Sequence, residues 1–240
     1  MERMKAQHAR PLVLICSDNA DFYVLLSHIL VREGFQTILV GDDDVFEQAS
    51  VKEVTAIILD SAREPSITLT ACAAIKGTDA TSHIPTIALV SAGDERHYLN
   101  LLKAGIDENF VRPVSPARLL AYLSSLVQSG ANRPRPAGEN PTPTVGFGAL
   151  KLDEGRRTVS YGDREIQLGP IEFKLLRRLF ESPGRVFSRL ELIEAAWPPN
   201  IYVQARTVDV HVGRLRRSLQ RLTGLALIRT VRAAGYAINI

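Results

Sequence analysis

The first half of the chain alternates short apolar runs with segments of helical periodicity. The apolar runs predict strands at 12–16, 37–40, 56–59, 86–90 and 109–111. Between them, apolar residues recur every three or four positions, which predicts helices at 20–32, 43–49, 67–75, 95–104 and 116–127. Five strand–helix repeats of this kind predict an α/β fold, in which a parallel sheet is covered by helices on both faces.

The second half has a different pattern, in which short strands come before the helices. Strands are predicted at 147–152, 158–161 and 165–168, with turn sequences between them. A helix is predicted at 170–181, with proline in its first turn. Another begins after Ser188, which forms a capping-box pattern with Glu191. The last predicted elements are a long helix at 206–222 and a hairpin of 227–230 with 236–240.

The two halves are joined by a segment with the composition of a linker. Residues 129–144 contain four prolines and two glycines and show no apolar periodicity, which predicts an extended connection. The predicted domains therefore span 1–128 and 145–240. No apolar run approaches the length of a transmembrane helix, and the basic N-terminus lacks the apolar segment of a signal peptide. We therefore expect a cytoplasmic protein with no membrane partner.

Charge is distributed unevenly between the predicted domains. Residues 1–128 carry 11 Lys and Arg against 16 Asp and Glu, whereas residues 145–240 carry 16 against 9. This asymmetry indicates that the second domain binds a polyanion, although a solvated basic surface has the same composition. The two cysteines, Cys16 and Cys72, lie in apolar runs and are predicted to be buried thiols. No Cys/His cluster has the spacing of metal ligands.

The predicted helix at 206–222 has one apolar face and one cationic face. The apolar stripe, spaced 4, 3, 4 and 3, consists of Val208, Val212, Leu215, Leu219 and Leu222. The opposite face consists of Arg206, Val210, Gly213, Arg214, Arg217 and Arg221. Such a helix suits the major groove of DNA, where Arg pairs with guanine and an apolar side chain such as Val210 contacts a thymine methyl. The alternative is an amphipathic helix whose cations are merely solvated.

The predicted C-terminal hairpin is also cationic. It carries Arg229, Thr230 and Arg232, followed by Gly235 and Tyr236. Cations at the tip of a two-stranded wing are expected to lie along phosphates or to enter the minor groove. For Tyr236, anchoring the hairpin to the core is as good an interpretation as a contact with DNA.

Residues 168–240 resemble the effector domain of the OmpR/PhoB response regulators. The resemblance is carried by LGPIEFKLLRRLFESPGRVFSR, RTVDVHVGRLRRSL and TVRAAGY, although Ala233 stands where that family usually has glycine. It implies a winged helix-turn-helix domain that is not an enzyme, with 206–222 as the recognition helix. The residues that match DNA-facing positions of the family are Arg206, His211, Arg214, Arg216 and Arg217, with Trp197, Thr230 and Arg232 near phosphate or the minor groove. Because His211 lies beside the apolar stripe, packing is its alternative role.

Polar residues follow the predicted strands of the first domain. Asp18 follows the first strand, and Asp60, Ser91 and Arg112 end the third, fourth and fifth. Because the carboxyl ends of parallel strands meet at one edge of a sheet, these four side chains define a candidate site.

Residues 11–128 resemble a CheY-like, flavodoxin-like receiver domain, with some departures at that site. The resemblance implies that Asp60 is the phosphoacceptor, that Asp18 is one of two acids that bind Mg²⁺, and that Ser91 is the hydroxyl that stabilises the phosphorylated state. Ser17 stands in place of the second acid, Arg112 in place of a lysine and Asn109 in place of the aromatic residue that signals phosphorylation.

These departures predict a receiver with weak or absent phosphorylation control. Asp18 and Asp60 remain as oxygen ligands, so Mg²⁺ binding is possible but is expected to be weak, and no cofactor is required. Arg112 keeps the positive charge and is expected to pair permanently with Asp60. The alternative is a conventional response regulator that accepts phosphate at Asp60 from a histidine kinase. An enzymatic role for Asp60 as a nucleophile is remote, since Ser61 and Ala62 provide no second acid.

The surface through which receivers of this family pair has few alternating charges here. We expect Tyr98, Leu99, Arg118 and Tyr122 to form an apolar and aromatic patch that pairs two copies of the chain. The sequence therefore predicts a homodimer that binds double-stranded promoter DNA, and the resemblance implies RNA polymerase as a further partner.

Overall fold

The computed structural model describes residues 10–60, 65–128, 144–147, 149–197 and 203–239. Its first part is a five-stranded parallel sheet with the order β2-β1-β3-β4-β5. The strands are β1 (Leu12–Cys16), β2 (Gln36–Val40), β3 (Val54–Asp60), β4 (Thr86–Val90) and β5 (Glu108–Val111). The helices are α1 (Ala20–Arg32), α2 (Val45–Val51), α3 (Pro65–Gly77), α4 (Glu95–Ala104) and α5 (Pro116–Gln128). Each strand and helix predicted for this half is confirmed, with ends that shift by two residues at most.

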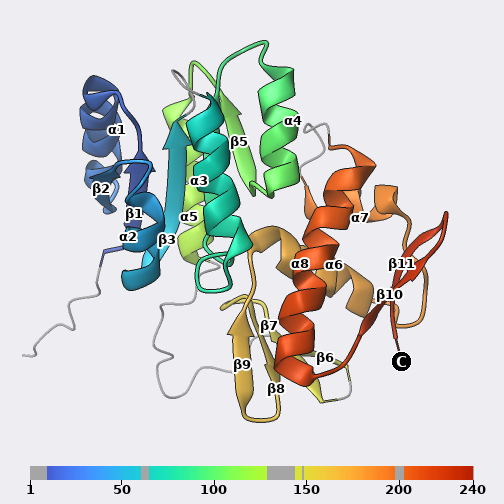
Figure 1. Ribbon diagram of the computed structural model, residues 1–240. Helices are drawn as coiled ribbons and strands as arrows, with labels where there is room; N and C mark the ends of the chain where they lie inside the picture. The colour runs from blue at the N-terminus through green and yellow to red at the C-terminus, as the bar shows by residue number, and fades with distance from the viewer. Residues whose placement is uncertain (1–9, 61–64, 129–143, 148, 198–202, 240) are drawn as a thin grey trace, which may run out of the picture.

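Helices cover both faces of this sheet, as the apolar runs predicted (Figure 1). Side chains alternate along β1, so that Val13 and Ile15 pack with α1 and α5, whereas Leu14 and Cys16 pack on the side of α2 and α3. Both cysteines are free and buried. Burial raises the pKa of the Cys72 thiol to about 12. Their interpretation as buried thiols is confirmed.

The second part contains a four-stranded antiparallel sheet, three helices and a hairpin. Its elements are β6 (Thr144–Phe147), β7 (Leu150–Asp153), β8 (Thr158–Tyr161), β9 (Arg164–Gln167), α6 (Pro170–Phe180), α7 (Arg189–Ala196), α8 (Ala205–Thr223), β10 (Ile228–Val231) and β11 (Gly235–Ile238). The prediction of a single strand at 147–152 was wrong, because Phe147 pairs with Leu150 and the chain reverses between them. The predicted linker 129–144 lies outside the described residues except for Thr144.

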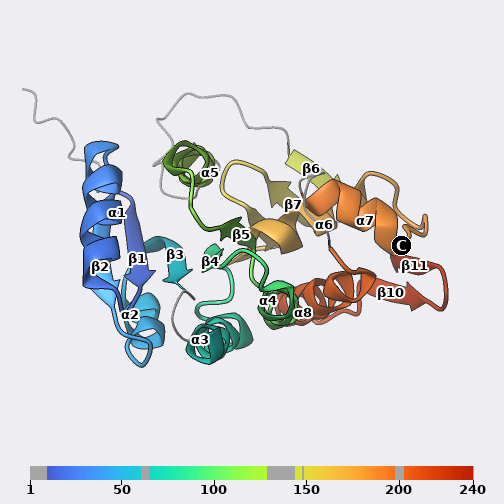
Figure 2. The same cartoon turned by 90° about the horizontal axis from the view of Figure 1, so that it is seen from above.

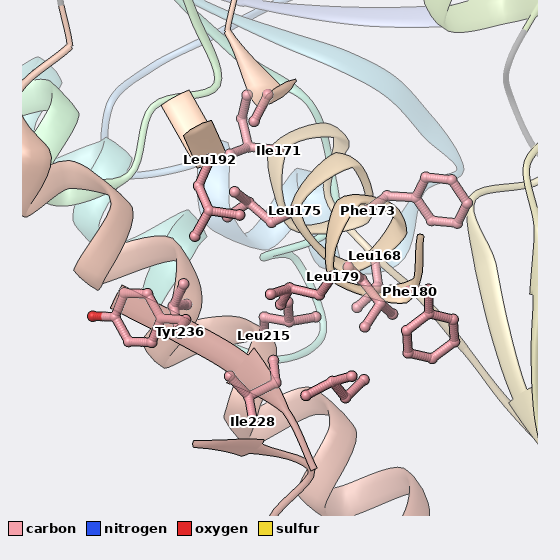
Figure 3. Close-up of a cluster of buried hydrophobic side chains, with 14 of the residues drawn as sticks. Leu168, Ile171, Phe173, Leu175, Leu179, Phe180, Leu192, Leu215, Ile228 and Tyr236 are labelled. Carbon is pink, nitrogen blue, oxygen red and sulfur yellow. The ribbon is translucent and has the colours of Figure 1, made fainter. Parts of the chain in front are cut away.

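The core of the second part is formed by α6, α7, α8, the hairpin and strands β7 and β8 (Figure 3). The stripe of α8 lies in this core, with Val208, Val212 and Leu215 fully buried. The capping box of α7 is present: Glu191 N donates to Ser188 Oγ at 3.2 Å, and Ser188 N donates to Glu191 Oε2 at 2.8 Å. Within the described ranges, none of the helices has the length and apolar character needed to cross a membrane.

Candidate nucleic-acid interface and phosphorylation site

The exposed side of α8 and the β10–β11 hairpin form one cationic surface. Arg206, Arg217 and Arg221 are exposed along the helix, and Val210 is half-buried among them. Thr230 and Arg232 are exposed on the hairpin, together with Arg229. Because α8 buries its other face in the core, this surface has the arrangement of a recognition helix with an adjacent wing.

Arg216 fixes the wing to the helix. Its Nε donates to the carbonyl oxygen of Ile228 at 3.0 Å, and its Nη2 donates to Thr230 Oγ1 at 2.7 Å. Its guanidinium also lies 5.3 Å from the centre of the Tyr236 ring. Arg216 was predicted to contact DNA. In the structure its half-buried side chain instead bonds the wing, where it orients Thr230.

Tyr236 anchors the hairpin, which was the alternative to a DNA contact. Its hydroxyl donates to Asp209 Oδ1 at 2.6 Å, and the residue is 4% exposed. Arg189 Nε donates to the same carboxylate oxygen at 2.8 Å. The sequence analysis missed Arg189 and Asp209, because three separate elements contribute to the network and no spacing rule connects them.

The prediction that His211 faces DNA is wrong in this structure. The residue is 0% exposed, and its Nδ1 lies 2.9 Å from Glu172 Oε1. Since His211 follows Val208 by three residues and precedes Leu215 by four, it belongs to the buried stripe. Trp197, expected near phosphate, is 4% exposed, with its ring 5.4 Å from that of His211. It therefore lies in the core.

Arg214, the central arginine of the outer face, contacts the first domain. Its Nη1 donates to the carbonyl oxygen of Gly105 at 3.0 Å, and its Nη2 donates to that of Ala104. These are carbonyls at the C-terminal end of α4, which carry partial negative charge. Arg221 forms an ion pair with Asp79 of the same domain. We call the contact of Arg214 with the end of α4 the α4–α8 contact, and Figures 1 and 2 show the two helices side by side.

Arg232 provides the simplest test of the wing. We expect Arg232→Ala to weaken DNA binding and to reduce the slope of log affinity against log salt by about 0.9, the value for one phosphate contact. Filter-binding titrations at several salt concentrations measure this slope. Arg96→Ala, which removes an exposed arginine of α4, is the matched control. An unchanged slope in Arg232→Ala would place this side chain away from the DNA.

At the carboxyl edge of the parallel sheet, Asp60 is held by two neighbours. Arg112 Nη2 lies 2.5 Å from Asp60 Oδ1, and the Asp60 side chain is 1% exposed. Ser17 Oγ donates to Asp60 Oδ2 at 2.9 Å. The Arg112 guanidinium also lies 4.2 Å from the centre of the Phe22 ring. Both carboxylate oxygens of Asp60 thus have protein partners, and the predicted ion pair of Arg112 with Asp60 is present.

Asp18 and Ser91 follow β1 and β4 at this edge, and both are exposed. Mg²⁺ requires several oxygen ligands in octahedral geometry. Ser17 contributes no charge, and the Arg112 cation occupies one side of the Asp60 carboxylate. In the described part of the chain, no group of three His, Cys, Asp or Glu side chains is arranged to hold a metal ion. This set of side chains therefore does not match the needs of Mg²⁺.

The predicted pairing surface faces the second domain. Tyr98 and Asn109 line a narrow gap that Trp197 also lines, and Tyr122 lines a cavity together with residues of α6. Leu99 is half-buried, and the Arg118 guanidinium lies 6.0 Å from the centre of the Phe110 ring. In this closed arrangement, in which the two domains pack together, Tyr98 and Tyr122 of the predicted pairing surface face the second domain, whereas Arg118 is exposed.

The sequence is similar to curated proteins along almost its full length. It is 36% identical over 232 residues to the phosphate regulon transcriptional regulatory protein PhoB of Rhizobium meliloti (strain 1021), covering 95% of this chain and 99% of that protein. The chain belongs to the OmpR/PhoB family of response regulators. PhoB of Escherichia coli (strain K12) is 30% identical over 228 residues, covering 95% of this chain and 97% of that one.

Two further comparisons agree with OmpR/PhoB membership. Residues 163–238 match the family model described as "Transcriptional regulatory protein, C terminal". The solved structure of a RitR mutant has a TM-score of 0.54 and 21% identity, covering 95% of this chain and 99% of that one, which shows a shared fold. This OmpR/PhoB protein is thus a DNA-binding response regulator of transcription, with a receiver domain and a winged-helix domain.

Proposed function

We propose that this chain regulates transcription by binding promoter DNA as a dimer, with little or no dependence on phosphorylation of Asp60. The observation that carries the proposal is the Asp60 carboxylate, which Arg112 and Ser17 contact through both oxygens. RNA polymerase bound at the same promoter is the further partner that this function implies.

The neighbours of Asp60 oppose phosphoryl transfer in two ways. A carboxylate oxygen must be free to attack phosphorus, and a metal ion normally neutralises the charge that develops during transfer. Here the Arg112 cation already neutralises the charge of the buried carboxylate. The unmodified receiver therefore has a charge balance that a conventional receiver acquires through its metal ion and lysine.

A conventional phosphorylation switch is the second candidate. It is favoured by the position of Asp60 at the end of β3, with Asp18 and Ser91 at the same sheet edge. In that case a histidine kinase would be a partner, and phosphate would have to displace Arg112 from Asp60.

The experiment that separates the two candidates measures DNA affinity with and without beryllofluoride and Mg²⁺. We expect Asp60→Ala and Asp60→Asn to change the affinity by less than about threefold, or roughly 0.7 kcal/mol, because an unused phosphoacceptor shifts no population. Beryllofluoride is expected to have no effect on the parent protein. As a positive control, Ser17→Asp combined with Arg112→Lys restores the usual acid and lysine and is expected to gain a beryllofluoride response. A gain of tenfold or more in the parent protein, abolished by Asp60→Ala, contradicts the proposal.

Dimerisation through Tyr98, Leu99 and Tyr122 requires the second domain to move away from this face. The same movement frees Arg214 from the α4–α8 contact and Arg221 from its ion pair with Asp79. Opening of the chain thus exposes the pairing surface and the recognition helix together, which is what a dimeric DNA-binding form needs.

A further inference from the structure

A cavity lies between the two domains, away from both Asp60 and the outer face of α8. Its volume is about 210 Å³. The receiver contributes residues of β5 and α5, including Glu108 and Tyr122, and the winged-helix domain contributes Arg157, Phe173 and Lys174. None of these residues belongs to the DNA-binding surface or to the phosphorylation edge described above.

Arg157 is the most unusual residue in the wall of this cavity. It lies in the turn between β7 and β8 and is 8% exposed. Among the described residues, its Nε and Nη1 atoms are buried without a hydrogen-bond partner. Burial lowers the pKa of this guanidinium. A buried cation with unused donors is strongly destabilising unless an anion pairs with it, so this side chain indicates an anion site.

Asp107 attracts Arg157 electrostatically, but no carboxylate among the described residues forms an ion pair with this guanidinium. Asp107 Oδ2 accepts from Lys76 Nζ at 2.5 Å and from the Thr86 amide at 2.7 Å. Burial raises the pKa of Glu108, which favours its neutral form. Lys174 Nζ donates to the carbonyl oxygen of Ala196 at 3.2 Å.

At the rim, Arg177 Nη1 lies 3.4 Å from Glu154 Oε2, so these two charges compensate each other. Asp107 Oδ1 is buried without a hydrogen-bond partner among the described residues. This oxygen is suited to accept from a hydroxyl group. The cavity therefore offers two donors for an anionic group and one acceptor for a hydroxyl.

Apart from Ser125, the remaining walls are apolar and set the size of a ligand. They consist of Tyr122, Leu126, Pro170, Ile171, Phe173 and Ala196. An apolar cavity of about 150 Å³ binds benzene, whereas drug-sized ligands occupy about 300–1,000 Å³. A volume of about 210 Å³ thus accommodates one aromatic ring with a small charged substituent.

We propose that this interdomain cavity binds a small aromatic carboxylate, whose carboxylate group pairs with Arg157 and whose ring packs against Phe173 and Tyr122. Because the ligand contacts both domains, it stabilises the closed arrangement in which Arg214 contacts the end of α4. Ligand binding therefore lowers affinity for DNA. This regulatory step rests on the proposed function, but binding itself is measured without DNA, so the two can fail independently.

Calorimetric titration of the full chain with benzoate, salicylate and 4-hydroxybenzoate tests the site, with benzamide as the uncharged probe. At least one carboxylate is expected to bind saturably, and benzamide is not. Arg157→Asn removes the cation and keeps a residue type that tolerates the positive φ of 51° at this position. We expect it to weaken binding at least tenfold. Arg156→Asn changes the exposed neighbour, which pairs with Glu165, and is expected to bind as the parent does.

A second variant keeps the test valid if Arg157→Asn fails to fold. Ser125 is exposed on α5 and lines the cavity, so Ser125→Phe places a ring in the ligand volume without altering Arg157. It is expected to abolish binding. The proposal is overturned if none of the three carboxylates binds the folded parent saturably, or if both variants bind as the parent does. Saturable binding that leaves DNA affinity unchanged overturns the regulatory step.

Discussion

Gly105→Ala is expected to raise the DNA affinity of the full chain about tenfold. A Cβ atom at this position would lie 1.5 Å from Arg214 Nη1, so the guanidinium must leave the end of α4. Hydrogen bonds from a charged donor contribute about 1.5–3 kcal/mol when buried, and Arg214 is partly exposed, so we expect a loss of about 1.4 kcal/mol from the closed form. The freed arginine is then available to DNA.

Gly34→Ala is the matched control for this prediction. Gly34 has a φ of 90°, close to the 88° of Gly105, and a Cβ atom there would meet nothing within 4 Å. Both variants thus strain the backbone to a similar extent, but only one disturbs Arg214. Affinity is measured by fluorescence anisotropy on a duplex selected from a random library by the full chain. Equal affinities of the two variants would show that the α4–α8 contact does not restrain DNA binding.

Glu172→Ala is expected to lower the free energy of unfolding of the winged-helix domain by about 3–5 kcal/mol, the usual cost of removing one member of a buried ion pair. Glu172 is 5% exposed, and His211, its partner, is 0% exposed. Removing the carboxylate leaves the imidazole buried without its partner and creates a cavity. Denaturant titration followed by fluorescence reports this domain, because Trp197 is the single tryptophan of the chain and its ring lies 5.4 Å from His211.

The contribution of Glu172 depends on pH with a definite sign. Burial favours a higher pKa for this carboxyl, but the charge and hydrogen bond of His211 outweigh it, so the pKa lies below its ordinary value of 4.5. The unfolded state thus binds the proton more readily, so the stabilisation is fully present above about pH 4.5 and is lost as pH falls from there through the native-state pKa of about 2. The difference between parent and Glu172→Ala should shrink accordingly. Glu194→Ala, on the exposed face of α7, should show neither effect.

Local periodicity predicted the elements of this protein better than it predicted their contacts. The stripe of α8 follows from its 4, 3, 4, 3 spacing, because a helix of 3.6 residues per turn brings these positions to one face. The same rule places His211 on that face, whereas the family resemblance places it toward DNA. The antiparallel pair of β6 and β7 was missed because Phe147, Leu150 and Leu152 lie within six positions and were assigned to one strand.

The pairing of Arg112 with Asp60 was predictable because both residues lie at the carboxyl ends of strands in one parallel sheet. The contact of Arg214 with Gly105 was not, since 109 positions of sequence separate them and the acceptor is a backbone carbonyl. Every residue has such an acceptor, so no residue type marks it. The sequence predicted only that a helix ends at residue 104, and the last carbonyl groups of a helix lack partners within it.

The α4–α8 contact has a consequence for how occupancy of a promoter depends on protein concentration. In the dimeric complex on DNA that we propose, each protomer opens, so the free energy of opening enters twice. A change of about 1.4 kcal/mol in the free energy of opening changes the opening equilibrium of each protomer about tenfold. It changes the equilibrium constant for assembling the dimeric complex on DNA about a hundredfold. Small changes where Arg214 contacts Ala104 and Gly105 thus change the protein concentration at which a promoter is half-occupied, while the structure of each domain stays nearly the same.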